Sequence, residues 1–127
     1  MSLPVILLVD DEPDLLQIMH ASLSMSLPEY AVRSAANFDE AVDCVERLEA
    51  QGGELALAVV DHVLGGDTGL EFIQMLNARH PKVPTMMFTG QAAQGVEKRA
   101  VEAGAKVVWK PIPLAKLMGE VQQILGC

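Results

Sequence analysis

The stretch PVILLVDDEP at residues 4–13 decides the fold class of this chain. Its first six residues are apolar without a break, as expected for a strand that is buried on both faces of a parallel sheet. The apolar run ends at Asp10 and Asp11, and Pro13 suits the first turn of a helix, because its ring presets φ and that turn needs no N–H donor. The stretch therefore predicts a buried strand, an acidic turn and a helix.

The same alternation of a short apolar run with a longer amphipathic stretch recurs along the chain, which is typical of repeated βα units. Strands are predicted at residues 4–9, 30–35, 55–60, 83–88 and 107–109. Helices are predicted to start near Pro13, Phe38, Leu70, Val96 and Leu114, the second of them after the N-cap candidate Asn37. Residues 65–69 are interpreted as a loop.

Five strands in strict alternation with five helices predict an α/β fold with one parallel sheet. Right-handed crossovers place helices on both faces of such a sheet. Five strands favour the flavodoxin-like order 2-1-3-4-5, a (βα)5 three-layer sandwich. No linker, internal repeat or low-complexity segment interrupts the 127 residues. We therefore expect one domain over residues 1–127, with residues 1–3 compatible with a cloning remnant.

The composition excludes several classes of protein. The chain has 9 Lys+Arg against 17 Asp+Glu and a formal net charge of -8, which argues against direct binding of nucleic acid or of an anionic membrane. The apolar runs are too short to cross a bilayer, and no secretory signal is visible. Two cysteines, Cys44 and Cys127, do not suggest a disulfide framework. We expect a cytoplasmic protein with two reduced thiols.

The chemically informative residues stand directly after predicted strands. Asp10 and Asp11 follow the first strand, Asp61 the third, Thr89 the fourth and Lys110 the fifth. Open α/β sheets bind their ligands at this carboxyl edge. Since strands one and three are neighbours in the predicted order, we expect the three aspartates to converge in one crevice flanked by the threonine and the lysine.

Three carboxylates in one crevice repel one another, so a cation must offset their charge. Hard oxygen ligands suit Mg²⁺, which combines one or two carboxylates with waters and phosphate oxygens. Lys110 adds a point charge suited to a phosphoryl oxygen, and the Thr89 hydroxyl can donate a hydrogen bond to another. Together these groups predict a phosphoryl-accepting site with Mg²⁺ as its cofactor.

Four short motifs carry a resemblance to a known family. They are VDDE at residues 9–12, VVD at 59–61, FTG at 88–90 and Lys110-Pro111. In this order and near this spacing, they resemble the hallmarks of the receiver domain of bacterial response regulators, and the match covers essentially the whole chain. Each motif alone is a weak signal, whereas four in register on a predicted (βα)5 frame are a strong one.

The resemblance implies a role for each matching residue. Asp61 would accept a phosphoryl group from a histidine kinase or a phosphotransfer protein. Asp11 would bind Mg²⁺ directly, Asp10 mainly through the hydration shell of the ion, and Asp61 and the backbone carbonyl of Val63 would complete the metal site.

Thr89 would swing toward the phosphoryl group and Lys110 would clamp it, with a cis peptide bond before Pro111. The chain would thus assist only its own phosphorylation and dephosphorylation and would not be an enzyme. Nothing follows the last predicted helix, so we expect the output to lie in a partner protein or in a domain outside this chain. The family usually relays its signal through its fourth helix, fifth strand and fifth helix.

The chain also departs from the family. Gly65-Gly66 replaces the usual proline-glycine, so we expect a more mobile loop there. Val107 stands where a Tyr or Phe usually acts as the switch residue, which leaves open whether Thr89 couples to an aromatic. Trp109 is expected to point to a different face of the strand and to pack in the core or against a helix.

Two further positions tune dephosphorylation in this family, and here they are Val63 and Gln91. An apolar side chain cannot orient an attacking water, so Val63 predicts a long-lived phosphoryl group. The alternative is that Val63 only packs against the helix that follows. Glu12 is interpreted as a first-turn carboxylate that favours the helix dipole, and His62 as a residue that points away from the crevice.

Three other functions compete with a phosphorylated receiver. A degenerate receiver would act as an unphosphorylated interaction module, which the departures at Val107 and Gly65 keep open. A phosphatase of the haloacid-dehalogenase type would need a second Asp two residues after the nucleophile, where this chain has Val63. A flavodoxin-like nucleotide binder would need a glycine-containing first turn, whereas residues 10–13 are acidic and end in proline.

Overall fold

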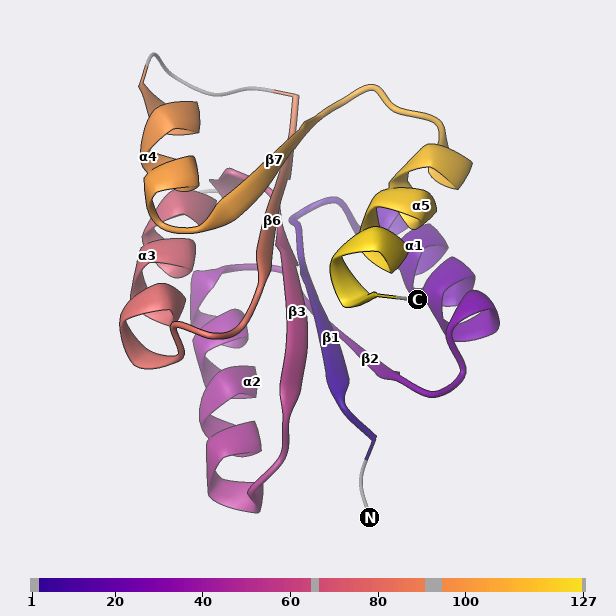
Figure 1. Ribbon diagram of the computed structural model, residues 1–127, viewed down its shortest axis with the longest axis horizontal. Coiled ribbons are helices and arrows are strands. Elements are labelled where there is room, and N and C mark those ends of the chain that lie inside the picture. The colour runs from indigo at the N-terminus through magenta and orange to yellow at the C-terminus, as the bar shows by residue number, and fades with distance from the viewer. Residues whose placement is uncertain (1–2, 65–66, 91–94, 127) are drawn as a thin grey trace.

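A computed structural model of the chain describes residues 3–64, 67–90 and 95–126. A five-stranded parallel sheet lies between two layers of helices (Figure 1). The strand order is β2-β1-β3-β6-β7, which confirms the predicted order 2-1-3-4-5 and the flavodoxin-like class. The bounds of these strands are Val5–Val9 for β1, Ala31–Ala35 for β2, Leu55–Val60 for β3, Thr85–Thr89 for β6 and Ala105–Trp109 for β7.

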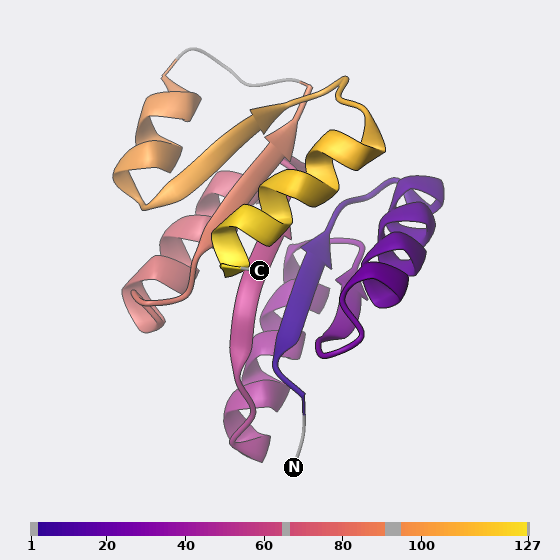
Figure 2. The same ribbon diagram turned by 45° about the vertical axis from the view of Figure 1, so that its right-hand side comes forward.

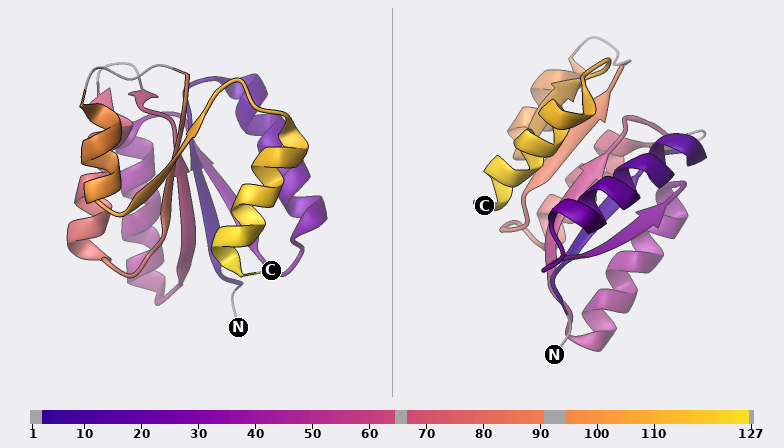
Figure 3. Two further views of the ribbon diagram at one scale, coloured as in Figure 1. Left: turned by 45° about the horizontal axis from the view of Figure 1, so that its top comes forward. Right: turned by 90° about the vertical axis from the view of Figure 1, so that its right-hand side faces the viewer.

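The helices divide between the two faces of the sheet. Helices α1 (Pro13–Ser26) and α5 (Leu114–Leu125) cover one face, and both lie in front of the sheet in Figure 2. Helices α2 (Phe38–Gln51), α3 (Gly69–Arg79) and α4 (Val96–Glu102) cover the other face (Figure 3). None of the described helices is long and apolar enough to cross a membrane.

Each face of the sheet packs its own apolar cluster. All five residues of β1 are buried, as the unbroken apolar run predicts for a central parallel strand. Ile6 and Leu8 pack toward α1 and α5, whereas Leu7 and Val9 pack toward α2 and α3. The alternation holds the strand in place from both sides, so the acidic residues that follow it leave the core at a defined point.

The helix ends follow from local sequence. Pro13 is the first residue of α1, as predicted. Asn37 is the N-cap of α2, because its Oδ1 accepts a hydrogen bond from the Glu40 N–H at 2.9 Å. The Glu40 carboxylate in turn accepts from the Ala36 N–H, which ties the chain entering the helix to its first turn. Gly52 ends α2 with φ at +67°, a conformation that glycine adopts without strain.

The segment between β3 and α3 differs from the loop predicted at residues 65–69. Strands β4 (Val63–Leu64) and β5 (Asp67–Thr68) form a small antiparallel pair. Two-residue strands are too short to give a periodic signal, so the sequence pattern could not show them. The mobility expected at Gly65-Gly66 concerns residues outside the described ranges.

The predicted placement of Trp109 is wrong. Its side chain is 42% exposed and belongs to neither apolar cluster among the described residues. Trp109 also lies two residues after Val107 and therefore on the same face of β7, not a different one. The reason for its exposure is position: β7 is the last strand of the sheet, and Trp109 is its last residue.

Candidate functional site

The three predicted aspartates meet at the carboxyl edge of the sheet. Asp10 and Asp11 follow β1, and Asp61 follows the neighbouring strand β3. One carboxylate oxygen from each lies within 4.8 Å of the others. Asp10 and Asp61 are buried, whereas Asp11 is exposed. The group therefore combines two carboxylates held inside the fold with one at its surface.

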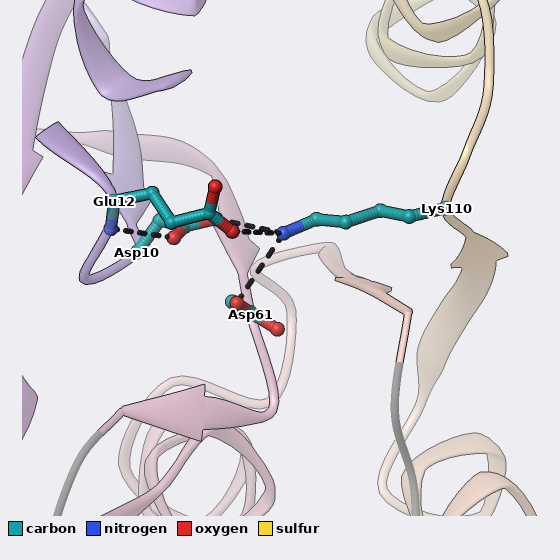
Figure 4. Close-up of polar contacts among 4 residues, drawn as sticks. All are labelled: Asp10, Glu12, Asp61 and Lys110. Carbon is teal, nitrogen blue, oxygen red and sulfur yellow. Dashed lines mark hydrogen bonds and ion pairs between the residues drawn. The ribbon is translucent and has the colours of Figure 1, made fainter. Parts of the chain in front are cut away.

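Lys110 reaches into this group from the far edge of the sheet (Figure 4). Its Nζ lies 3.2 Å from Oδ2 of Asp10 and 3.3 Å from Oδ2 of Asp61. Its backbone N–H donates to the carbonyl of Thr89, and the bond to Pro111 is cis, as expected from the resemblance. The lysine thus bridges the acidic ends of β1 and β3 although it follows β7.

The electrostatics of the site reflect both burial and charge. Burial raises the pKa of the Asp10 carboxyl above its ordinary value, and the nearby charge of Asp61 adds to the rise. Burial by itself would lower the pKa of Lys110, but the carboxylates of Asp10 and Asp61 outweigh it, and the net effect is a raised pKa. The site therefore holds a charged lysine beside an excess of carboxylates.

This donor set fits a divalent cation. Three carboxylates face one ammonium group, so negative charge remains after the ion pairs are made. Oxygen donors from Asp10, Asp11 and Asp61 are hard ligands, which Mg²⁺ prefers, and the exposure of Asp11 leaves the position open to water. The residues present therefore suit Mg²⁺ with part of its hydration shell.

The other predicted site residues take different positions. Thr89 is the last residue of β6 and is fully buried. Val107 is half-buried and packs against the cluster under α2, α3 and α4. The backbone of Val63 lies in β4, two residues after Asp61. Gln91 lies outside the described residues.

A glycine that the sequence analysis does not single out, Gly69, lies close against the backbone of Asp61. The N–H of Gly69 donates to the carbonyl of His62 at 2.8 Å, which closes the base of the β4–β5 pair. A Cβ atom at Gly69 would lie 2.0 Å from the carbonyl oxygen of Asp61, so no larger residue fits without moving that backbone. The one feature of the sequence that marks Gly69 is its position directly after Thr68, which is the N-cap of α3.

Two contacts of Lys110 were also not predicted. The sequence predicts a helix-dipole role for Glu12, but its Oε1 lies 3.5 Å from the lysine Nζ and its backbone N–H donates to Asp10 at 2.9 Å. The ring of Phe88 lies beneath the same ammonium group, 5.1 Å from Nζ to the ring centroid. Phe88 belongs to the FTG motif, in which the resemblance implies a role for the threonine alone.

The arrangement has the parts needed for phosphoryl chemistry. A buried carboxylate of Asp61 can act as an oxygen nucleophile, and the adjacent lysine and a bound cation can meet the charge of a transferring group. Among the described residues, no histidine or cysteine belongs to this group of carboxylates.

Comparisons with known proteins point to one family. The family model described as response regulator receiver domain matches residues 6–122. The chain is 31% identical over 112 residues to the response regulator protein PilR of Pseudomonas aeruginosa, which covers 87% of this chain and 24% of that protein. It is 32% identical over 120 residues to response regulator RppA of Synechocystis sp., covering 94% of this chain and 49% of that protein.

The solved structures give the same result for the fold. A CheY-like response regulator receiver domain protein from Methanospirillum hungatei superposes with a TM-score of 0.86 at 26% identity, covering 98% of this chain and 95% of that one. This chain spans less than half the length of the curated relatives that it matches.

Proposed function

Because this chain belongs to the response regulator receiver domain family, we propose that it is a phospho-accepting receiver of a two-component system with Asp61 as the acceptor. Receiver domains are in general signalling modules rather than enzymes, and Mg²⁺ and phosphoaspartate are typical of the family. The observation that carries the proposal is the position of Asp61, buried beside Asp10 and 3.3 Å from the Lys110 ammonium.

The proposed reaction is a transfer from nitrogen to oxygen. A carboxylate oxygen of Asp61 attacks the phosphorus of a phosphohistidine on a histidine kinase or phosphotransfer protein. The new P–O bond forms as the P–N bond breaks, and the imidazole leaves with the electron pair of that bond. The product is an aspartyl phosphate on this chain and an unmodified histidine on the donor.

The carboxylates of Asp10, Asp11 and Asp61 would hold Mg²⁺ together with the backbone carbonyl of Val63, Asp10 mainly through a bound water. The ion supplies charge neutralisation at the transferring phosphoryl group. Lys110 already lies against the acceptor carboxylate and would bind a second phosphoryl oxygen. The Thr89 hydroxyl would donate to a third.

The lifetime of the aspartyl phosphate would depend on Val63 and Gln91. An apolar side chain at Val63 gives an attacking water no hydrogen-bond partner, so we expect slow hydrolysis. Replacement of Val63 with Asn would shorten the half-life, measured by the loss of the phosphorylated mass over time. An unchanged or longer half-life would leave Val63 with a packing role only.

Phosphorylation would act by shifting a conformational equilibrium that a partner reads. The partner would be an output protein or an output domain outside these residues, and the location would be cytoplasmic. Val107 supplies no aromatic ring at the usual switch position, so the shift would have to proceed without a buried tyrosine or phenylalanine there.

Intact mass measurement tests the proposal directly. Incubation with Mg²⁺ and acetyl phosphate should add one phosphoryl group to the chain. Asp61→Asn should add none, and Asp39→Asn, which changes an exposed aspartate in the first turn of α2, should behave like the unchanged chain. If the unchanged chain gains no phosphoryl group from acetyl phosphate or phosphoramidate, the chain is a degenerate receiver and the proposal is wrong.

A further inference from the structure

Lys110 contacts an aromatic ring, that of Phe88, in addition to the carboxylates of the site. The lysine Nζ lies over the ring of Phe88, 5.1 Å from its centroid. Phe88 is buried and belongs to the apolar cluster that packs under α1 and α5. Packing in the core therefore holds the ring in place, and the face of the ring contacts the ammonium group of Lys110.

The contact follows from strand register. Phe88 of β6 pairs with Val108 of β7, and Lys110 comes two residues later, on the same face as Val108. The neighbour of Phe88 in the chain, Thr89, points to the opposite face. One strand therefore presents a ring to the lysine on one face of the sheet and a hydroxyl to the opposite face.

A cation–π interaction of this kind stabilises a cation that is partly removed from water. The face of an aromatic ring carries negative potential and attracts an ammonium group within about 6 Å of its centroid, most strongly when water is excluded. Lys110 is 19% exposed at its side chain, so much of its hydration is already lost. The ring replaces some of that lost solvation without adding another formal charge to an already acidic site.

We propose that Phe88 is a positioning residue: through a cation–π contact, its ring holds the Lys110 ammonium group close to the Asp61 carboxylate. The proposal rests on the proposed function, because it assigns Phe88 a part in the reaction at Asp61.

The ring matters most when the carboxylates are engaged elsewhere. In the structure, Asp10 and Asp61 attract Lys110 from 3.2 and 3.3 Å. With a cation bound to these carboxylates, their pull on the lysine falls, whereas the attraction of the uncharged ring stays. A lysine side chain has a flexible four-carbon stem, so without the ring its ammonium would sample positions away from the acceptor. Phe88 would therefore keep the lysine ready for the incoming phosphoryl oxygen.

Three variants separate the aromatic face from simple packing. Phe88→Leu removes the ring and keeps an apolar side chain, and Phe88→Tyr keeps the ring. Phe72→Leu is the matched control, because Phe72 is a buried phenylalanine on the other face of the sheet, in α3, where it contacts Phe38. The rate of phosphorylation by acetyl phosphate with saturating Mg²⁺ should fall about tenfold in Phe88→Leu and stay near the original rate in the other two.

Equal slowing in Phe88→Leu and Phe88→Tyr, or in Phe88→Leu and Phe72→Leu, would overturn the proposal, because packing would then explain the effect.

A nuclear magnetic resonance measurement tests the contact independently of phosphorylation. The ε-CH₂ protons of Lys110, assigned by their loss in Lys110→Arg, should be displaced upfield by the ring relative to those of Lys82, Lys98, Lys106 and Lys116, and Phe88→Leu should abolish the displacement. If the folded, unchanged chain shows no displacement, the inference is wrong whatever its phosphorylation. A displaced lysine in a chain that gains no phosphoryl group would instead retain the contact and reject the proposed function.

If Phe88→Leu does not fold, Phe88→Met serves in its place. The signals of the unchanged chain decide the contact without any variant of Phe88.

Discussion

Two ionic clusters lie at opposite ends of the sheet, and they differ in burial and in charge balance. The carboxyl-edge cluster consists of Asp10, Asp11, Asp61 and Lys110. The amino-edge cluster consists of Glu49 at the end of α2 and Arg79 and His80 at the end of α3. In the second, both oxygens of one carboxylate are taken, by Nη2 of the arginine at 2.5 Å and Nε2 of the histidine at 2.6 Å.

The comparison shows what burial and excess charge do together. The amino-edge side chains are about one-third exposed, and their single carboxylate is fully partnered, so the cluster can do little beyond linking two helices. The carboxyl-edge cluster buries two carboxylates with one lysine and retains negative charge. This excess of negative charge lowers the stability of the folded chain, and it also gives the cluster affinity for a cation such as Mg²⁺.

The largest expected effect comes from removing the positive charge of Lys110 from the carboxyl-edge cluster. Lys110→Met would leave Asp10 and Asp61 without the lysine, and losing one partner of a buried ion pair costs about 3–5 kcal/mol. Urea unfolding with EDTA present should show this loss. Lys106→Met is the matched control, because Lys106 on the same strand is exposed and pairs with Glu120 at the surface, so it should cost under about 1 kcal/mol. Similar losses in the two variants would contradict the contrast between buried and exposed charge.

The next effect is stabilisation by Mg²⁺, which only the carboxyl-edge cluster should provide. A cation that binds the folded chain alone should raise the free energy of unfolding by about 2.7 kcal/mol at a concentration 100 times its Kd. Asp11→Asn should lose most of this gain, because it removes the exposed carboxylate that offers the open ligand position. Asp14→Asn, an exposed change in the first turn of α1, should keep it. Thermal unfolding with and without Mg²⁺ measures the gain in stability of each variant. If Asp11→Asn gained as much from Mg²⁺ as the original chain, the ion would have to bind elsewhere.

The fold and the meeting of the aspartates could be predicted because both depend on strong, repeated signals. The buried strand at residues 5–9 has an unbroken apolar run, and the strand order makes β1 and β3 neighbours. Once these strands lie side by side, Asp10 and Asp61 must share an edge. No side-chain detail was needed for that step.

The features that could not be predicted depend on the register between neighbouring strands or on the position of a residue in an edge strand. The contact of Phe88 with Lys110 joins residues 22 positions apart and requires the exact pairing of β6 with β7. Trp109 is apolar, so composition favoured burial, but an edge strand leaves its last residue exposed. The reach of Glu12 to Lys110 depends on a side-chain conformation that no pattern encodes.

A smaller effect should follow from relieving the charge of the carboxyl-edge cluster. Burial, and then Asp61, raise the pKa of Asp10 above its ordinary 3.8. As the pH rises above 3.8, the unfolded chain loses this proton before the folded chain does, so the contribution of Asp10 to stability falls until the pH passes its folded-state pKa. Asp10→Asn does not titrate, and with EDTA present it should be more stable than the original chain at pH 7.

That advantage should shrink as the pH is lowered toward 3.8, where the Asp10 carboxyl of the original chain is itself largely neutral. Urea unfolding of both chains at several pH values measures the difference. An advantage that grows on acidification would mean that the charged form of Asp10 is favoured in the fold, and that the excess charge at this edge carries no cost.

The smallest effect should come from the amino-edge cluster. Glu49→Gln removes the charge that links α2 to Arg79 and His80 but keeps one oxygen acceptor, and exposed ion pairs are worth about 0.2–1 kcal/mol. The loss should shrink further in 1 M salt, where charges are screened within about 3 Å. Phosphorylation by acetyl phosphate should be unchanged, since this cluster lies at the opposite end of the sheet. A loss as large as that of Lys110→Met would show that burial does not decide how much an ionic cluster contributes to this fold.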